Sequence, residues 1–225
     1  VRDPGNAGTI VRSADAAGAD AVVFSATSVD PYNPKTVRAS AGSLFHLPIV
    51  RAADTAEAVA ALRERGLRVY AMDAEGEADL YHLDLTRPSA FVFGNEAWGL
   101  PEEIARLAET TVRVPIAGRA ESLNLAAAAS VTLFEWARQR REGRRVALET
   151  LIAAAAHDIR SPLTAMKGFG YALVTRWEQM TAEQRELMLR GIVYDTDRLN
   201  AIVRQLVDAA RLTAGALDLY PERVR

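Results

Sequence analysis

The chain has 225 residues, of which 49% are apolar and 25% are charged, and this composition is that of globular proteins and excludes wholesale disorder. Lys and Arg number 27 against 29 for Asp and Glu, a formal charge of −2, so a nucleic-acid partner would need a local basic patch rather than a basic tail. Cysteine is absent, which excludes disulfides, thiolate metal ligands and cysteine nucleophiles, and no apolar run reaches the roughly 18 residues of a membrane span.

The first half of the chain alternates short β-branched or aromatic runs with stretches of helical apolar spacing. The predicted strands are residues 21–24, 49–51, 68–72, 90–93 and 111–114, and predicted helices over 55–65 and 101–107 lie between them. Alternation of this kind predicts a mainly parallel sheet covered by helices. The chain opens with the pattern of a strand end that leads into a loop, so we expect a further strand before it.

The second half shows no convincing strand. A helix is predicted over residues 122–141, a basic linker over 142–147, and two long helices over 147–177 and 181–213. Thr181, followed by Glu183 and Gln184, is the predicted cap of the second long helix.

Each long helix carries an apolar seam. The seams are Leu148, Leu151, Ile152, Ala155, Ile159, Leu163 and Met166 on the first helix, and Leu199, Ile202, Val203, Leu206 and Val207 on the second. A helix of 30 residues is about 45 Å long, and two such helices cannot bury both seams alone. We therefore expect a hairpin that dimerises into a four-helix bundle. Because an elongated hairpin of this kind normally leads into another part of a protein, we also expect a further segment after residues 221–225.

Three segments of the first half combine glycine with polar residues near predicted strand ends: residues 3–12, 91–100 and 114–124. Ligands of α/β proteins usually bind beyond the carboxyl ends of parallel strands, and glycine lets backbone approach a ligand closely. Any one of these segments alone is most simply a strand–turn–helix connection. Three together indicate a site.

These segments, with residues 32–42, resemble the SpoU branch of the knotted methyltransferases, which transfer a methyl group from S-adenosyl-L-methionine to a ribose 2′-oxygen of ribosomal or transfer RNA. The resemblance covers residues 1–141. It implies a trefoil knot, which is a rare exception among folds. It also implies a homodimer with the active site at its interface, S-adenosyl-L-methionine as cofactor and a structured RNA as partner.

The resemblance also assigns the cofactor site. Gly94, Ile116 and Leu123 match positions whose backbone groups hold the adenine and ribose of the cofactor, and Asn95 matches a polar position near its methionine part.

The catalytic residues implied by the resemblance are Asn6, Arg12, Glu96, Ser122 and Asn124. A guanidinium stays charged at any working pH, so Arg12 is a poor free base but a good clamp for a phosphate and a good stabiliser of charge on a 2′-oxygen. Two groups could accept the proton of the ribose 2′-hydroxyl: Arg12, assisted by a phosphate of the RNA, or Glu96.

A second motif surrounds His157 on the first long helix. Ala155 and Ile159 of the seam lie two positions to either side, and such positions diverge by about 200°, so His157 is expected to face outward. Pro162 lacks an amide hydrogen and weakens the helix at Asp158.

This motif resembles the H-box of sensor histidine kinases, and residues 148–219 resemble their dimerisation and phosphoacceptor domain. The resemblance implies that His157 is the phosphorylated residue and that Asp158 assists it. No ATP-binding boxes follow in this sequence, so a kinase ATP-binding domain and a response regulator would be separate partners. His46 and His82 lack partners at metal-ligand spacing, and no metal site is expected.

The favoured interpretation is a cytoplasmic fusion of a SpoU-type methyltransferase domain, residues 1–141, with a phosphoacceptor hairpin, residues 148–219. One alternative is a sensor histidine kinase whose methyltransferase-like domain is a sensor or structural module. Another is a methyltransferase whose hairpin serves only to hold two copies together.

Overall fold

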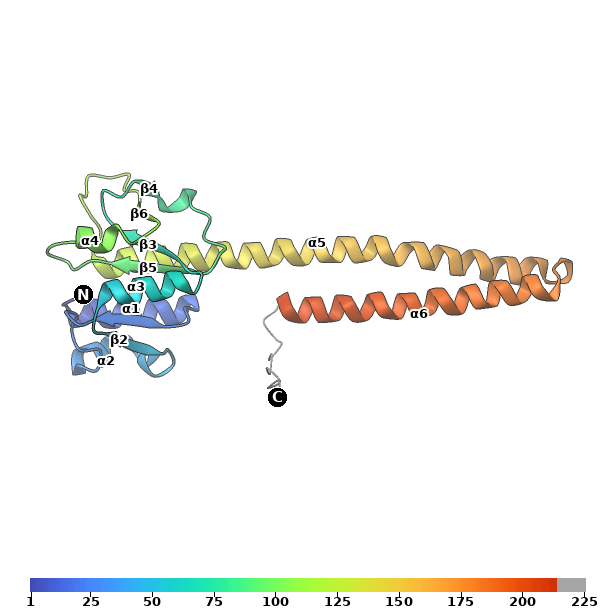
Figure 1. Ribbon diagram of the computed structural model, residues 1–225, viewed down its shortest axis with the longest axis horizontal. Coiled ribbons are helices and arrows are strands. Elements are labelled where there is room, and N and C mark those ends of the chain that lie inside the picture. The colour runs from blue at the N-terminus through green and yellow to red at the C-terminus, as the bar shows by residue number, and fades with distance from the viewer. Residues whose placement is uncertain (214–225) are drawn as a thin grey trace. The chain divides into compact units, whose positions relative to one another are not determined.

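The computed structural model describes residues 1–213 and divides the chain into two compact units, Val1–Arg141 and Glu142–Arg225 (Figure 1). The first unit contains, in order, α1 (Pro4–Ala17), β1 (Val22–Ser25), α2 (Pro34–Ser40), β2 (Ile49–Ala52), α3 (Thr55–Glu64), β3 (Arg68–Met72), β4 (Ala78–Asp79), β5 (Ser89–Phe93), α4 (Glu102–Ala105) and β6 (Thr110–Arg113). Helix α5 (Leu125–Arg176) begins in the first unit and ends in the second, which also holds α6 (Ala182–Thr213). Short 3-10 turns lie at Ser43–Phe45, Leu80–His82 and Trp177–Gln179.

The strands form two sheets, one of order β1-β2 and one of order β4-β6-β3-β5. Every pairing is parallel, with Val22 opposite Ile49 and Tyr70 opposite Phe91. The predicted parallel-sheet α/β fold is thus confirmed, and all five predicted strands are present. The strand β4 was not predicted because two residues are too few to show an alternating pattern.

Alternating side chains of β3 point to opposite faces of the larger sheet and build a different cluster on each. Tyr70 packs in a cluster with Trp136 of α5, whereas its neighbour Val69 packs with Val59 of α3 and Ile104 of α4. Helices therefore cover both faces of this sheet, as its apolar strands require.

The first polar segment, residues 3–12, is helical rather than a loop. Helix α1 begins at Pro4, and the side chain of Asp3 accepts a hydrogen bond from the backbone N–H of Asn6 at 2.7 Å. Helix α2 begins in the same way, with Asn33 as its cap. A capping residue followed by proline is a helix-start signal that outweighs the glycine content of the segment.

The predicted linker, residues 142–147, is helical, because α5 continues through it. Arg, Ala and Glu, which make up most of this segment, are good helix formers, and Gly143 alone costs about 1 kcal/mol relative to alanine. Arg145 also lies 4.0 Å from the carboxylate of Glu142 and 3.7 Å from that of Glu149, at helical spacings that support the turn.

The second unit is a helical hairpin, as predicted. The cap of α6 is confirmed as a reciprocal pair, since Thr181 N–H donates to Gln184 Oε1 at 3.0 Å and Gln184 N–H donates to Thr181 Oγ1 at 3.3 Å. Gly191 of α6 leaves room for the ring of Phe169, which a Cβ would approach to 2.7 Å. The predicted end of the hairpin at Leu219, and residues 221–225, lie outside the described residues.

Much of the apolar surface of this hairpin is exposed in the single chain. Exposed apolar side chains are Val146, Leu148, Ile152, Leu163, Tyr171, Val174, Trp177, Leu187, Leu189, Val193, Tyr194, Val203 and Val207. Several belong to the two predicted seams. No helix within residues 1–213 is both long and apolar enough to cross a membrane.

Candidate active site

Three segments that are far apart in the sequence meet through one asparagine. Asn6, on the first turn of α1, donates from Nδ2 to Glu96 Oε1 at 3.0 Å and accepts at Oδ1 from Asn124 Nδ2 at 3.2 Å. We call this set the Asn6–Glu96–Asn124 cluster. It joins the start of α1, the loop after β5 and the start of α5.

Each member of the cluster is also held by its own backbone surroundings. Asn124 caps α5, since its Oδ1 accepts from the N–H groups of Ala126 and Ala127 at 2.9 and 3.3 Å. This leaves its Nδ2 directed at Asn6. The second oxygen of Glu96 accepts from the backbone N–H of Arg2 at 3.3 Å. The cluster is thus a fixed arrangement of polar groups rather than a set of free side chains.

The Glu96 carboxylate is stabilised in its charged form. Partial burial works against ionisation, but the hydrogen bond from Asn6, backbone N–H groups and the nearby amino end of the chain outweigh it and lower the pKa of Glu96. A carboxylate with a lowered pKa is a weaker base than an ordinary glutamate.

The loop after β5 is built on close backbone contact. Asn95 and Gly99 exchange two backbone hydrogen bonds of 3.0 Å, and a Cβ on Gly94 would overlap the carbonyl of Gly99. Asn95 Oδ1 accepts from the N–H groups of Ala97 and Trp98 at 2.9 and 2.7 Å. Gly94 and the side-chain oxygen of Asn95 therefore shape the loop itself.

The loop between β6 and α5 is open to solvent. Ile116, Ser122 and Leu123 are exposed, and within residues 1–213 the backbone groups of Ile116 and Leu123 make no hydrogen bond. Unpaired backbone donors and acceptors of this kind are suited to a ligand with polar edges.

Arg12 lies outside the cluster of its own chain. It follows Asn6 by six positions on α1, about 120° around the helix and about 9 Å along it. Its side chain is exposed and makes no hydrogen bond or ion pair to any residue that the structure describes. The structure therefore brings together Asn6, Glu96 and Asn124 but leaves Arg12 and Ser122 apart from them.

Comparison with known proteins gives the family. Residues 1–134 match the sequence profile described as the SpoU rRNA Methylase family. The chain belongs to this family. Residues 147–215 match a second profile, the His Kinase A (phospho-acceptor) domain.

Relatives of the SpoU region include two curated enzymes. The chain is 43% identical over 146 residues to the 23S rRNA (uridine(2479)-2′-O)-methyltransferase of Streptomyces viridochromogenes, covering 63% of the chain and 51% of the relative. It is 38% identical over 134 residues to the 23S rRNA (guanosine(2553)-2′-O)-methyltransferase RlmP of Bacillus subtilis, covering 60% of the chain and 54% of the relative. The chain thus spans about half the length of these curated relatives.

Solved SpoU structures share the fold. The SpoU methyltransferase AviRb of Streptomyces viridochromogenes, solved in complex with AdoMet, aligns with a TM-score of 0.60 at 40% identity over 63% of this chain and 58% of its own. An AdoMet-bound rRNA methyltransferase of Sinorhizobium meliloti aligns with a TM-score of 0.58 at 46% identity over 61% and 53% of the two chains.

The SpoU region contains polar contacts that no motif in the sequence predicted. The N–H of Arg2 binds Glu96, and the hydroxyl groups of Ser13 and Ser130 lie 2.7 Å apart, linking α1 to α5. A backbone N–H carries no residue-type signal, and two serines 117 positions apart show no spacing pattern. Asp3 could have been found, because Asp-Pro before a helix is a known start signal.

His157, in the His Kinase A region, is exposed as its helical position predicts. Its side chain is 84% accessible, and Nδ1 lies 3.2 Å from Asp158 Oδ1. An ionised carboxylate can only accept, so this contact favours the tautomer with the proton on Nδ1 and a lone pair on Nε2. Helix α5 continues through Pro162. No group of three or more His, Asp or Glu side chains within residues 1–213 could hold a metal ion.

Proposed function

We propose that this chain is an S-adenosyl-L-methionine-dependent ribosomal RNA ribose 2′-O-methyltransferase that carries a histidine phosphoacceptor hairpin. The observation that carries the first part is the contact of Asn6 with both Glu96 and Asn124. A degenerate sensor module would have no reason to keep three polar residues from separate segments in mutual hydrogen bonds, so this contact favours an enzyme over the sensor alternative. A ribosomal RNA substrate, supported by the names of the relatives, implies a cytoplasmic protein.

The residues at the loops fit the cofactor. The unpaired backbone groups of Ile116 and Leu123 are suited to the polar edges of an adenosine. Gly94 permits the close backbone contact with Gly99 that shapes the 95–99 turn, the other loop that the resemblance assigns to the cofactor. When bound, S-adenosyl-L-methionine would supply the methyl group.

The roles of the side chains follow from what each already binds. Both oxygens of Glu96 accept hydrogen bonds and its pKa is lowered, so we assign it to holding Asn6 rather than to taking a proton. Arg12, which is exposed and charged, would bind the phosphate beside the target ribose and stabilise the 2′-oxygen as its proton leaves. Ser122 and Asn124 lie at the end of the loop between β6 and α5 and would orient the ribose.

A homodimer accounts for the position of Arg12. Arg12 and the Asn6–Glu96–Asn124 cluster lie on different sides of α1, so a second copy that packs against this helix would bring the two together. The trefoil knot and the interface site remain part of this proposal.

The direct test measures binding of the cofactor and transfer of its methyl group to RNA. S-adenosyl-L-methionine should bind in calorimetry in preference to ATP, and labelled methyl should appear on 23S rRNA. Both are measured on the 225-residue chain. No binding by this chain, when circular dichroism shows that it is folded, would overturn the proposal.

The second part of the proposal rests on His157. Its accessible Nε2 and its contact with Asp158 suit an acceptor of phosphate, and the exposed seams of the hairpin suit a dimer. With a separate kinase ATP-binding domain and ATP, the chain should acquire an acid-labile, base-stable phosphate and sediment as a dimer. A dimer that never takes the label would leave the hairpin only a dimerisation element.

A further inference from the structure

Positive charge is concentrated on one short stretch of α5. Residues 138–145, which we call the basic segment, contain five arginines and one glutamate, a formal charge of +4. The whole chain has a formal charge of −2, so everything outside this segment carries −6. At 1.5 Å per residue the basic segment is only about 12 Å long. A dense local patch on an otherwise acidic chain is typical of a surface that binds an anionic partner.

Two arginines of the basic segment are already neutralised by carboxylates of the same helix. The Nε and Nη2 atoms of Arg138 each donate to an oxygen of Glu135 at 2.8 Å. Arg145 lies 4.0 Å from the carboxylate of Glu142 and 3.7 Å from that of Glu149. These pairs hold Arg138 and Arg145 against their own helix, so both have less charge to offer to a partner.

The other three arginines, Arg140, Arg141 and Arg144, form no ion pair with any residue that the structure describes. Arg141 and Arg144 are exposed, and Arg140 is partly exposed. At 100° per residue the three positions lie within about 100° of one another around the helix axis. We call them the arginine surface. Their guanidinium groups therefore leave the helix on one side.

The arginine surface repels itself. Arg140 lies four positions before Arg144, and Arg141 lies three positions before Arg144 and four before Arg145. Like charges at these spacings are neighbours on a helix and destabilise it, and Gly143 among them is a poor helix former. The phosphates of a polyanion bound along this side would relieve the repulsion, which is a physical reason for such a partner to bind here.

The first turn of the basic segment is anchored to the Val1–Arg141 unit. Gln139 Nε2 donates to the carbonyl of Leu83 at 3.0 Å, and Gln139 Oε1 accepts from the N–H of Leu85 at 2.9 Å. The guanidinium of Arg140 lies 4.8 Å from the centre of the buried Trp136 ring. These contacts fix the turn that begins the arginine surface, so a partner would bind it with less loss of conformational entropy.

The arginine surface lies on the helix that begins at the candidate active site. Asn124 caps α5 and belongs to the Asn6–Glu96–Asn124 cluster. Arg141 follows Asn124 by 17 positions, which is about 25 Å along the helix. An RNA carries one phosphate per nucleotide, so a strand with its target ribose at the cluster has further phosphates within reach of this distance.

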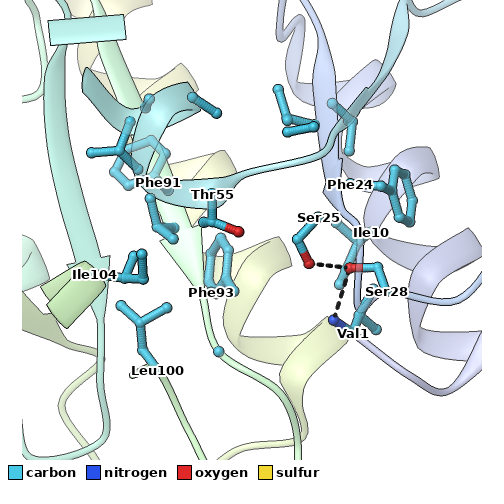
Figure 2. Close-up of a pocket in the computed structure, with 18 of the residues that line it drawn as sticks. Val1, Ile10, Phe24, Ser25, Ser28, Thr55, Phe91, Phe93, Leu100 and Ile104 are labelled. Carbon is cyan, nitrogen blue, oxygen red and sulfur yellow. Dashed lines mark hydrogen bonds between the residues drawn. The ribbon is translucent and has the colours of Figure 1, made fainter. Parts of the chain in front are cut away.

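The pocket between β1 and β5 is a poor alternative site for a polyanion. It has a volume of about 450 Å³, and Figure 2 shows Phe24, Phe91 and Phe93 among its lining. Within residues 1–213, no Lys or Arg side chain lines this pocket. It therefore offers no side-chain cation to a phosphate, in contrast to the arginine surface.

We propose that Arg140, Arg141 and Arg144 bind the phosphate backbone of the RNA substrate at a distance from the reacting ribose. The proposal rests on the proposed function, which makes RNA the substrate. Arginine suits this task because its planar guanidinium binds two phosphate oxygens at once and stays charged. Phosphate contacts position a nucleic acid without identifying its bases, so the arginine surface contributes affinity rather than sequence preference.

The test compares two double variants of the 225-residue chain. Arg141→Gln with Arg144→Gln removes two members of the arginine surface, and Arg198→Gln with Arg204→Gln removes two exposed arginines of α6 and gives the same net charge. Glutamine is about as good a helix former as arginine, and circular dichroism checks the fold. The probe is a fluorescein-labelled RNA hairpin with a stem of about 16 base pairs, the length that double-stranded-RNA-binding domains span. Its binding is followed by anisotropy over a range of salt concentrations.

The Arg141/Arg144 variant should show a weaker salt dependence of binding. The slope of log K against log salt should fall by about 1.4–1.8, because two fewer phosphates are neutralised and fewer counterions are released. Relative to about 1 M salt, where ion pairs contribute little, this difference is a loss of affinity of about 25–60-fold at about 0.1 M salt. The Arg198/Arg204 variant should bind like the unchanged chain.

Three outcomes would overturn the proposal. The first is an unchanged affinity and salt slope in the Arg141/Arg144 variant, or no binding of the RNA by the unchanged chain. The second is an equal loss in both double variants, since net charge rather than position would then set the affinity. The third concerns vesicles of phosphatidylserine and phosphatidylcholine. If the Arg141/Arg144 variant loses binding to these vesicles but not to RNA, the arginine surface belongs to a membrane contact.

The proposed enzyme is tested separately. Anisotropy needs neither cofactor nor methyl transfer, and calorimetry with S-adenosyl-L-methionine does not involve the arginine surface. A chain that binds the cofactor and methylates RNA, but whose RNA affinity does not depend on Arg141 and Arg144, would overturn this proposal alone. A chain whose RNA affinity depends on them, but which binds no cofactor, would overturn the proposed function alone.

Discussion

The two units hold their polar residues in opposite ways. In the Val1–Arg141 unit, Asn6 is fixed by partners 90 and 118 residues away, so its geometry exists only when the sheet and helices are assembled. In the Glu142–Arg225 unit, His157 is bonded to the next residue on the same helix and is otherwise exposed. The first site is a product of tertiary structure, whereas the second needs only a helix. Changes near Asn6 should therefore act on folding and chemistry together, and changes at His157 on chemistry alone.

The largest effect is expected at His157. His157→Gln should abolish the phosphate label from a supplied ATP-binding domain while leaving the dimer and the methyl transfer unchanged, because the side chain points to solvent. His82→Gln is the matched control, since His82 is 85% accessible and has Asp79 at 3.7 Å. Labelling is read by acid and base lability and dimerisation by sedimentation. A label that survives His157→Gln would place the phosphate elsewhere.

Arg12→Ala should lower the rate of methyl transfer by about 10²-fold or more, as removal of one group that stabilises developing charge usually does. Calorimetry should show unchanged binding of S-adenosyl-L-methionine, since Arg12 makes no contact with the loops that fit it. Arg51→Ala, which removes another exposed arginine of the same unit, should transfer methyl at the normal rate. Normal transfer by Arg12→Ala would show that the phosphate is bound by another residue.

Gly94→Ala should destabilise the first unit by about 1–3 kcal/mol, because the new Cβ overlaps the Gly99 carbonyl and forces the backbone to shift. Gly118→Ala, where a Cβ meets no atom within 4 Å, should change stability little. Urea unfolding monitored by tryptophan fluorescence compares the two variants. An equal loss in both would mean that loop entropy, rather than the Gly94–Gly99 contact, sets the cost.

The smallest effect concerns Glu96 and pH. In the folded chain the pKa of Glu96 lies below its ordinary value of 4.5. The ionised carboxylate therefore contributes fully to the free energy of unfolding above pH 4.5, and this contribution is lost as the pH falls through the folded-state pKa. The stability advantage over Glu96→Gln should therefore shrink between pH 5 and pH 3, by less than about 1 kcal/mol because the side chain is exposed. Thermal unfolding at several pH values measures it, with Glu103→Gln as an exposed control. A difference that does not vary with pH would contradict the assigned hydrogen bonds.

Elements whose signals are local could be predicted from the sequence. The strands at Arg68–Met72 and Ile49–Ala52, the cap at Thr181 and the outward position of His157 each follow from periodicity or a short motif, because hydrogen bonding and side-chain direction within a helix or strand depend on near neighbours. Local signals also explain one wrong expectation, because the helix start at Asp3-Pro4 outweighs the glycines of α1 where a loop was expected. They explain as well why the linker is helical, since good helix formers carry α5 through residues 142–147.

Contacts between distant segments could not be predicted from the sequence. Asn6 contacts Glu96 and Asn124 while Arg12 does not, and the N–H of Arg2 supports Glu96. Residues of β1 and β5, which belong to different sheets, line one pocket. All three arrangements are consequences of how the chain is folded between distant segments. Residue types along one chain carry no record of such distances, because the free energy of packing the whole domain, rather than any local preference, brings these groups together.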